Sequence, residues 1–271
     1  ASPEILVRQE QVEGGQKITI RPLAGTRPRG ASPELDKAAE LELLRAMEDD
    51  VDARMLTALI TTDPLMTLKL LAHIANHHRS RRVTDVETVG QGLVLLGITP
   101  FFNTFGPQPT VEQHLEGQPE ALEGLKAVIG RAHRAARLAL GFAVHRMDTD
   151  APVIHEAALL HDFAEMLLWL HAPDLALAIR RRQQADPSLR SATVQRELLG
   201  VTLADLQQAL MQAWRLPELL IHITDDRRET ATQVRNVMLA IRLARHTAQG
   251  WDNPAVPDDV RDIAQLLNMS P

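Results

Sequence analysis

A histidine and an aspartate stand side by side in the middle of a long apolar segment of this chain. The pair is His161-Asp162, and the segment runs from Ile154 to Leu170. Burying a polar group costs on the order of a few kcal/mol unless the group finds a partner. Two adjacent polar side chains therefore predict one of three arrangements: a mutual hydrogen-bond network, a bound ligand or a metal ion. The function of the chain depends on whether the other residues that such chemistry needs are present.

The composition favours a helical globular protein. With 271 residues, 45% of them hydrophobic, the chain can bury a substantial core in one or two domains. Aromatic residues make up only 3% and tyrosine is absent, while alanine, leucine, arginine and glutamate dominate. This usage favours helices over strands. We therefore expect an all-α fold with a short N-terminal β region.

Charge and residue usage argue against several classes of function. The formal net charge of −6 does not suit a nucleic-acid-binding protein, which usually carries a basic face. The chain has no cysteine, and therefore no disulfide, thiolate metal site or cysteine nucleophile. No apolar run approaches the roughly 18 residues of a membrane span, and the start does not resemble a signal peptide. We expect a cytoplasmic protein with no nucleic-acid and no membrane partner.

Residues 1–30 are predicted to form a unit of their own, made of a β-hairpin and a linker. Two β-rich runs, Glu4–Arg8 and Gln16–Arg21, flank a segment that contains Gly14-Gly15. This pattern is typical of a hairpin. Pro22–Pro28 follows as a linker, because it holds turn residues and little to bury.

Residues 31–271 carry the start and stop signals of helices. Ser32-Pro33 and Asp63-Pro64 each offer an N-cap followed by proline. Thr84 with Glu87 offers a capping box, and Gly97 is placed to end that helix. The later helices are expected at 119–147, from about 151 onward, and at 174–184, 192–199, 202–214, 217–223, 230–248 and 257–269. The prediction is a multi-helix bundle in two helical subdomains, at about 31–106 and 118–271, joined by residues 106–118.

His133 and the His161-Asp162 doublet follow the order of a metal site built on helices. Imidazole and carboxylate ligands can hold one or two divalent ions, which generate hydroxide near neutral pH and stabilise charge on a phosphate. These residues therefore allow one hypothesis: a metal-dependent phosphohydrolase in which Asp225 or Asp226 serves as a substitute ligand.

The same order of residues resembles the HD superfamily, and the chain as a whole resembles its HDOD branch, the HD-related output domain of bacterial signalling proteins. The resemblance covers about residues 32–248. The pieces that carry it, in the family's order, are Thr62-Asp63-Pro64, Lys69-Leu70-Leu71, Val83-Thr84, Val94-Leu95-Leu96-Gly97, Leu159-Leu160-His161-Asp162, Glu197-Leu198-Leu199-Gly200 and Trp214-Arg215-Leu216-Pro217. It implies an HD-like helical bundle and a role in signal transduction.

The chain departs from the family's pattern at three places. Where the family commonly has a histidine after the Glu-x-x-x-Gly piece, this chain has Leu203. Asp225-Asp226 stands where a histidine pair is usual, and Arg242 falls near the distant aspartate of catalytic HD enzymes. A guanidinium cannot ligate a metal ion, and its fixed positive charge would repel one while pairing readily with Asp162. Metal-dependent hydrolysis is therefore disfavoured, and no metal or cofactor is expected.

The site is thus interpreted as an inherited polar pocket formed by His133, His161, Asp162 and Arg242. Either Arg242 or Arg245 is expected to project toward Asp162 and close the site electrostatically. The leading hypothesis is a non-catalytic regulatory module that acts through contacts with a protein partner, which could include a second copy of the chain in a homodimer. A small-ligand sensor that uses the pocket is a further alternative.

Three other features have weaker functional interpretations. His73 and His77 have the i, i+4 spacing of a zinc site but no identifiable third ligand. Phe101-Phe102 fits either the core or an exposed partner patch. The N-terminal runs also resemble the start of an EAL domain, although 30 residues are far too few for one.

Overall fold

The computed structural model describes residues 7–12, 15–20, 37–77, 86–106, 109–186, 188–228, 231–248 and 250–269. The described part of the chain from residue 37 onward is helical, which confirms the all-α class. The elements are β1 (Val7–Val12), β2 (Gly15–Ile20), α1 (Lys37–Ala46), η2 (Glu48–Asp50), α2 (Ala53–Ile60), α3 (Pro64–His77), α4 (Val89–Leu96), α5 (Ile98–Thr104), α6 (Val111–His114), α7 (Pro119–His145), α8 (Ala151–Leu160), α9 (Phe163–His171), α10 (Pro173–Ala185), α11 (Ser191–Leu199), α12 (Leu203–Ala213), α13 (Glu218–Ile223), η3 (Asp226–Arg228), α14 (Thr232–His246) and α15 (Val256–Leu266).

The N-terminal strands pair with each other. β1 and β2 are antiparallel, with a register that runs from Val7 opposite Ile20 to Val12 opposite Gly15. Residues 13 and 14, which connect them, lie outside the described residues, as do the predicted linker Pro22–Pro28 and the predicted cap at Ser32-Pro33.

The starts of the early helices follow from side-chain caps. Asp63 Oδ1 accepts the backbone N–H groups of Leu65 and Met66, both at 3.1 Å, which confirms the predicted start of α3. At α4 the capping box lies at Thr88 and Gln91. The sequence placed it one turn earlier, at Thr84 and Glu87, of which Thr84 lies outside the described residues. Gly97 ends α4 as predicted, with a φ of +86° that favours glycine.

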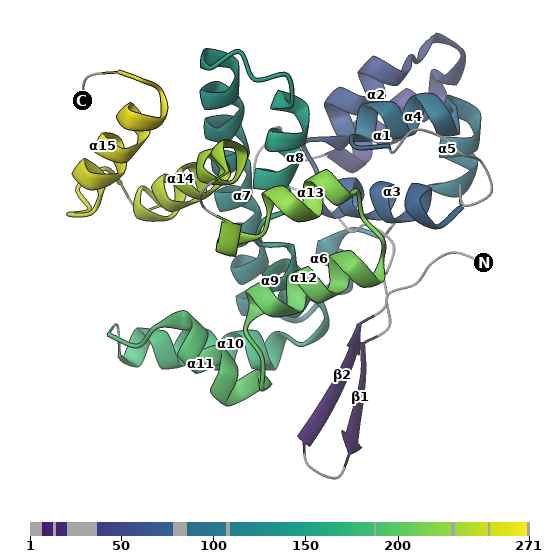
Figure 1. Cartoon of the computed structure of the whole chain (residues 1–271). Helices are drawn as coiled ribbons and strands as arrows, with labels where there is room; N and C mark the ends of the chain where they lie inside the picture. Colours follow the sequence, from purple (N-terminus) through teal and green to yellow (C-terminus); the bar gives the residue numbers. More distant parts are fainter. Residues whose placement is uncertain are drawn as a thin grey trace.

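The long helix α7 is the central element of the bundle. It packs against α8, α9 and α14 (Figure 1), and its bounds agree with the predicted 119–147 to within two residues. Small residues allow this close packing: Ala132, Ala135, Ala136 and Ala139 are all buried. A Cβ added at Gly124 would lie 2.7 Å from the indole of Trp169 on α9, so glycine is required there.

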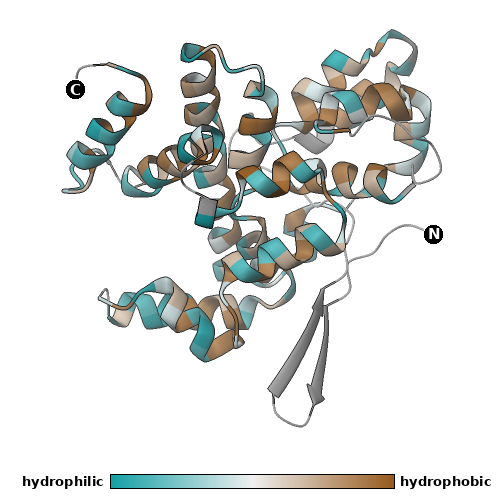
Figure 2. Ribbon diagram, viewed as in Figure 1, coloured by the Kyte–Doolittle hydropathy of each residue, from teal (hydrophilic) through white to brown (hydrophobic). Residues whose placement is uncertain are grey.

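Buried apolar residues from both predicted subdomains belong to one continuous core, which extends from Leu41 to Leu266. Helix α3 contacts α8 across the predicted division, and Val111 of the joining segment is fully buried. Figure 2 shows hydrophobic residues along the faces of the helices that meet, and hydrophilic residues over much of α10, α11 and α15. Of the helices in the described part of the chain, none combines the length and apolar character needed to cross a bilayer.

Glu156 of α8 links the two regions through a buried carboxyl group. Its two oxygens face the backbone N–H of Val89, at 3.0 and 3.3 Å, and the residue is 2% exposed. Val89 is the first residue of α4, so Glu156 caps the N-terminus of that helix. Burial raises the pKa of Glu156 to about 8, and the hydrogen bond from Val89 lowers it only in part.

We predict that Glu156→Gln makes the stability of the protein less sensitive to a rise in pH from about 4.5 to 8. The carboxyl group loses its proton near pH 4.5 in the unfolded chain and near 8 in the folded one, so the wild type loses stability as the pH rises between these values. Glutamine keeps an acceptor for Val89 and has no proton to lose. Urea denaturation should show the free energy of unfolding shifting in favour of the variant over this range, by up to roughly a few kcal/mol.

Glu120→Gln is the matched control, since that side chain is 67% exposed. It should show no such trend with pH. A Glu156→Gln effect of the same size at every pH would contradict the interpretation.

Candidate functional site

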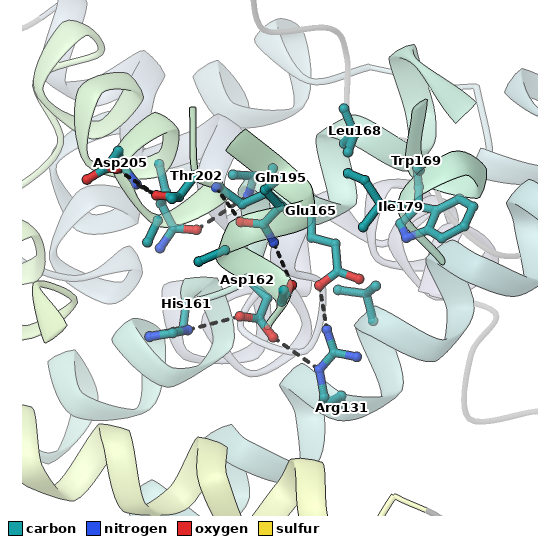
Figure 3. A pocket seen from close by; sticks show the side chains of 18 of the residues that line it. Arg131, His161, Asp162, Glu165, Leu168, Trp169, Ile179, Gln195, Thr202 and Asp205 are labelled. Carbon is teal, nitrogen blue, oxygen red and sulfur yellow. Dashed lines mark hydrogen bonds and ion pairs between the residues drawn. The ribbon is translucent and has the colours of Figure 1, made fainter. Parts of the chain in front are cut away.

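The His161-Asp162 doublet lies at the junction of two helices. The sequence predicted one helix through this segment, but α8 ends at Leu160 and α9 begins at Phe163. The backbone carbonyl of Asp162 accepts the N–H groups of Glu165 at 3.0 Å and Met166 at 3.2 Å. The two polar residues thus form the turn between α8 and α9, and their side chains line a cavity (Figure 3).

The Asp162 carboxylate is surrounded by cationic side chains. Arg131 of α7 donates from Nε to Asp162 Oδ2 at 3.1 Å, and Arg245 of α14 donates from Nη2 to Oδ1 at 2.8 Å. His161 Nδ1 lies 3.0 Å from the same Oδ1. Arg131 also donates from Nη2 to Glu165 at 2.7 Å. Because both carboxylate oxygens of Asp162 accept hydrogen bonds, the group is fully engaged by the protein.

The imidazole of His161 lies between two carboxylates. Its Nδ1 faces Asp162, and its Nε2 lies 2.9 Å from Oδ1 of Asp226, which belongs to η3. Burial alone would lower the pKa of His161, but the hydrogen bonds and negative charges of Asp162 and Asp226 outweigh it and raise the pKa to about 9. His161 is therefore an imidazolium at neutral pH, donating from both ring nitrogens.

The ion pairs also fix the charge of Asp162. Burial would raise the pKa of this carboxyl, but Arg245, His161 and Arg131 hold it well below its ordinary value. Burial raises the pKa of the neighbouring Glu165, with Arg131 acting in the opposite direction. The cations Arg131, His161 and Arg245 are thus matched by the carboxyl groups of Asp162, Glu165 and Asp226. We name these six residues the Asp162 cluster.

The structure brings together two of the residues that the sequence placed in the pocket, His161 and Asp162. Arg242 lies elsewhere: it pairs with Asp259 at 2.6 Å and with Asp262, both on α15. Its neighbour by one helical turn, Arg245, is the arginine of α14 that reaches Asp162. The sequence analysis expected either Arg242 or Arg245 to reach Asp162, because sequence spacing does not show which side of α14 faces the site.

His133 does not line the cavity. It lies near His155 of α8, whose pKa is lowered by burial and by the charge of His133. Sequence reasoning missed Arg131 and Glu165, which have no motif of their own. The one available signal was the charge on Asp162, which requires a buried cation nearby. The sequence offered Asp226 only as a possible substitute metal ligand, and in the structure its carboxylate contacts His161.

The cavity has a volume of about 790 Å³ and is lined by residues of α7, α9, α10, α11, α12 and η3 together with Arg245. Figure 3 shows Arg131, His161 and Asp162 on one side and Leu168, Trp169 and Ile179 on another, with Glu165 between them. Gln195, Thr202 and Asp205 form a third part of the wall. In the part of the chain that the structure describes, no group of three or more histidine and carboxylate side chains is arranged to hold a metal ion.

The other candidates from the sequence have structural roles. Phe101 and Phe102 are buried, so they belong to the core. The ring of His73 packs edge-on against Phe105, with the ring centroids 5.1 Å apart. The side chain of His77 lies outside what the structure describes.

Comparison with known proteins identifies the class of this helical domain. The model of the HDOD domain matches residues 36–229, which is well over half of the chain. The chain therefore belongs to the HDOD domain family. Helix α14, which supplies Arg245, lies beyond the matched residues.

Two solved structures share the fold. MmoQ, a response regulator from Methylococcus capsulatus str. Bath, has a TM-score of 0.66 at 19% identity, and the match covers 86% of this chain and 95% of that one. A virulence factor from Campylobacter jejuni subsp. jejuni has a TM-score of 0.57 at 18% identity, covering 86% and 84% of the two chains. At these identities the likeness concerns the fold alone.

The N-terminal region is similar to a different class of protein. A model of chorismate binding enzymes matches residues 1–64. Anthranilate synthase component 1 from Thermus thermophilus is 36% identical over 105 residues, covering 37% of this chain and 22% of that protein. The Cereibacter sphaeroides protein of the same name is 48% identical over 63 residues, covering 23% and 12%.

The chain thus spans less than a quarter of the length of these curated relatives. The N-terminal region is therefore described by its similarity to chorismate binding enzymes rather than by the resemblance to an EAL domain.

We predict that Asp162→Asn strongly destabilises the fold. It would leave buried Arg131 and His161 without their shared carboxylate, and breaking a buried ion pair from one side costs roughly 3–5 kcal/mol. Arg245→Gln should cost only about 1 kcal/mol or less, because the Arg245 side chain is 50% exposed. Urea denaturation measures both changes.

Asp258→Asn serves as the surface control, since that side chain is 70% exposed. Its effect should stay within about 0.5 kcal/mol. If Asp162→Asn were as mild as this control, the cluster would not hold the helices together.

Proposed function

We propose that this chain is a non-catalytic signalling domain of the bacterial HDOD type, working in the cytoplasm through contacts with a protein partner. We further propose that an ion-pair network has replaced the metal site of catalytic HD proteins. The single observation that carries this proposal is the pairing of Arg131 and Arg245 with both oxygens of Asp162.

The residues around Asp162 do not fit a divalent ion. Metal ligands must offer a free lone pair, so histidine has to be neutral and carboxylates have to be unengaged. Here both ring nitrogens of His161 face carboxylates and its pKa is about 9. A cation entering the site would also meet the fixed positive charges of Arg131 and Arg245. We therefore assign no hydrolytic step to this cluster.

Two further observations support a role in protein contacts. The first is the shared fold with a solved protein described as a response regulator, MmoQ. The second is the exposure of Leu140, Val144 and Met147, which are 36%, 62% and 88% accessible at the C-terminal end of α7. Leu140 and Val144 are four residues apart and so lie on one side of α7, and Met147 follows in the turn after the last helical residue, His145. Such apolar groups suit contact with a partner or with a second copy of the chain.

The competing function is a metal-dependent phosphohydrolase. One contact favours this function: the carboxylate of Asp226 lies 2.9 Å from His161 Nε2, where it could replace a missing metal ligand. That function would require Arg131 and Arg245 to leave Asp162, and each is held there by a hydrogen bond of 3.1 Å or less.

Metal analysis tests the proposal. Protein purified without chelator should contain far less than one equivalent of iron, manganese or zinc, and it should not hydrolyse bis(p-nitrophenyl) phosphate when these ions are added. The Arg245→Asp variant should bind Mn²⁺ more tightly than the wild type, because the substitution replaces the guanidinium that pairs with Asp162 by a carboxylate, which can ligate a metal ion. Stoichiometric metal that is lost in Asp162→Ala would refute the proposal.

A further inference from the structure

The cavity continues past the Asp162 cluster into an apolar compartment. Its walls there include Val128 of α7, Leu168 of α9, and Ala176 and Ile179 of α10. A volume of about 790 Å³ falls in the range of roughly 300–1,000 Å³ that is typical of small-molecule sites. This compartment offers no catalytic group, but it can remove the apolar body of a small molecule from water.

The arginines that line the cavity fall into two groups. Arg131, Arg227 and Arg245 each pair with a carboxylate. Arg180 of α10 and Arg196 of α11 also line the cavity, and among the described residues neither has a carboxylate partner. The two helices pack against each other. Among the described residues, the cavity-lining arginines that lack a carboxylate partner therefore lie on α10 and α11.

Arg180 is held in place by an aromatic ring. Its guanidinium carbon lies 4.4 Å from the ring centroid of Trp169, a cation–π contact that orients the group while its N–H donors stay in the guanidinium plane. Trp169 is itself fixed by close packing on Gly124. An anion that binds Arg180 would therefore meet a donor group that is already ordered.

The neighbouring polar groups are satisfied within the protein. The Gln195 side chain accepts the Leu203 backbone N–H at 2.9 Å and donates to Ser191 Oγ at 2.8 Å. Thr202 donates to Asp205 at 2.7 Å. The side chains of Gln195 and Thr202 are thus engaged within the protein, and the cationic groups of this wall are the two arginines.

We propose that this cavity binds an organic anion with an apolar body. The carboxylate or phosphate group pairs with Arg180 and Arg196, and the apolar body lies against Val128, Leu168 and Ile179. The proposal does not depend on the partner contacts proposed above, and it assigns the ligand to a part of the cavity outside the Asp162 cluster. An inorganic anion would leave the apolar compartment unfilled, and a neutral hydrocarbon would leave the arginines unpaired.

Isothermal titration calorimetry with simple probes tests this assignment. Octanoate and octyl phosphate carry both features of the ligand and differ only in the anionic group. Acetate lacks the apolar body and 1-octanol lacks the charge. We expect saturable binding of one octanoate or octyl phosphate per chain, and at least about tenfold weaker binding of acetate and 1-octanol, because the loss of a charged hydrogen bond or of apolar burial each costs affinity.

Variants locate the binding site. Arg180→Gln and Arg196→Gln should each weaken binding about tenfold. Arg181→Gln and Arg182→Gln are matched controls from the same helix α10. They pair with Glu120 and Glu197 on the surface and do not line the cavity, so their affinity should equal that of the wild type. Circular dichroism checks that each variant is folded. If Arg180→Gln does not fold, the affinity of Arg196→Gln alone tests the proposal.

The proposal is overturned if neither anionic probe binds saturably at millimolar concentration, if 1-octanol binds as tightly as octanoate, or if the control variants lose as much affinity as the two lining variants. Tighter binding of octyl phosphate than of octanoate would identify the natural ligand as a phosphate ester. Tighter binding of octanoate would identify it as a carboxylic acid. Failure of this experiment leaves the metal analysis of the Asp162 cluster unaffected.

Discussion

The buried carboxylate of Asp162 is the constraint on which the rest of the site depends. A charge in this position is costly unless ion pairs and hydrogen bonds compensate it. The compensation comes from Arg131 on α7, His161 at the end of α8 and Arg245 on α14. Asp226 then extends the network from His161 to η3. Elements far apart in the sequence are thus held around one side chain.

The same contacts decide what chemistry the cavity can offer. His161 and Asp162 are engaged in internal ion pairs, which is the basis of the proposed non-catalytic role. The charge left over lies on Arg180 and Arg196, beside the apolar compartment. One part of the cavity is thus the Asp162 cluster, whose charged groups pair with one another. The other part contains Arg180, Arg196 and the apolar compartment, and this is where we place the proposed ligand.

Much of the fold was predictable because its signals are local. Asp63-Pro64 specified the start of α3 through a cap, and the apolar spacing along 119–147 specified α7. The doublet itself marked the site, since two polar residues within an apolar run need an explanation. The family resemblance then gave the class of fold, and the family match supports it over residues 36–229.

The rest depended on geometry that no local pattern records. The break between α8 and α9 falls at the doublet itself, and because apolar residues continue on both sides of it, periodicity could not locate the break. The choice between Arg242 and Arg245 depends on how α14 is rotated, and α15 settles it by engaging Arg242 through Asp259 and Asp262. Arg131 and Asp226 reach the doublet from 30 or more residues away in sequence. The similarity of residues 1–64 to chorismate binding enzymes came from comparison rather than from residue patterns.

The most direct test of the account is the titration of His161, followed by the ¹⁵N chemical shifts of its ring. The account predicts an imidazolium that persists through neutral pH and titrates near 9. It follows that His161 stabilises the fold fully below its ordinary pKa of about 6.5 and loses this contribution as the pH rises through 9. Asp226→Asn should lower the midpoint, while Asp225→Asn should leave it unchanged. A wild-type midpoint at or below about 6.5 would contradict the ion-pair network.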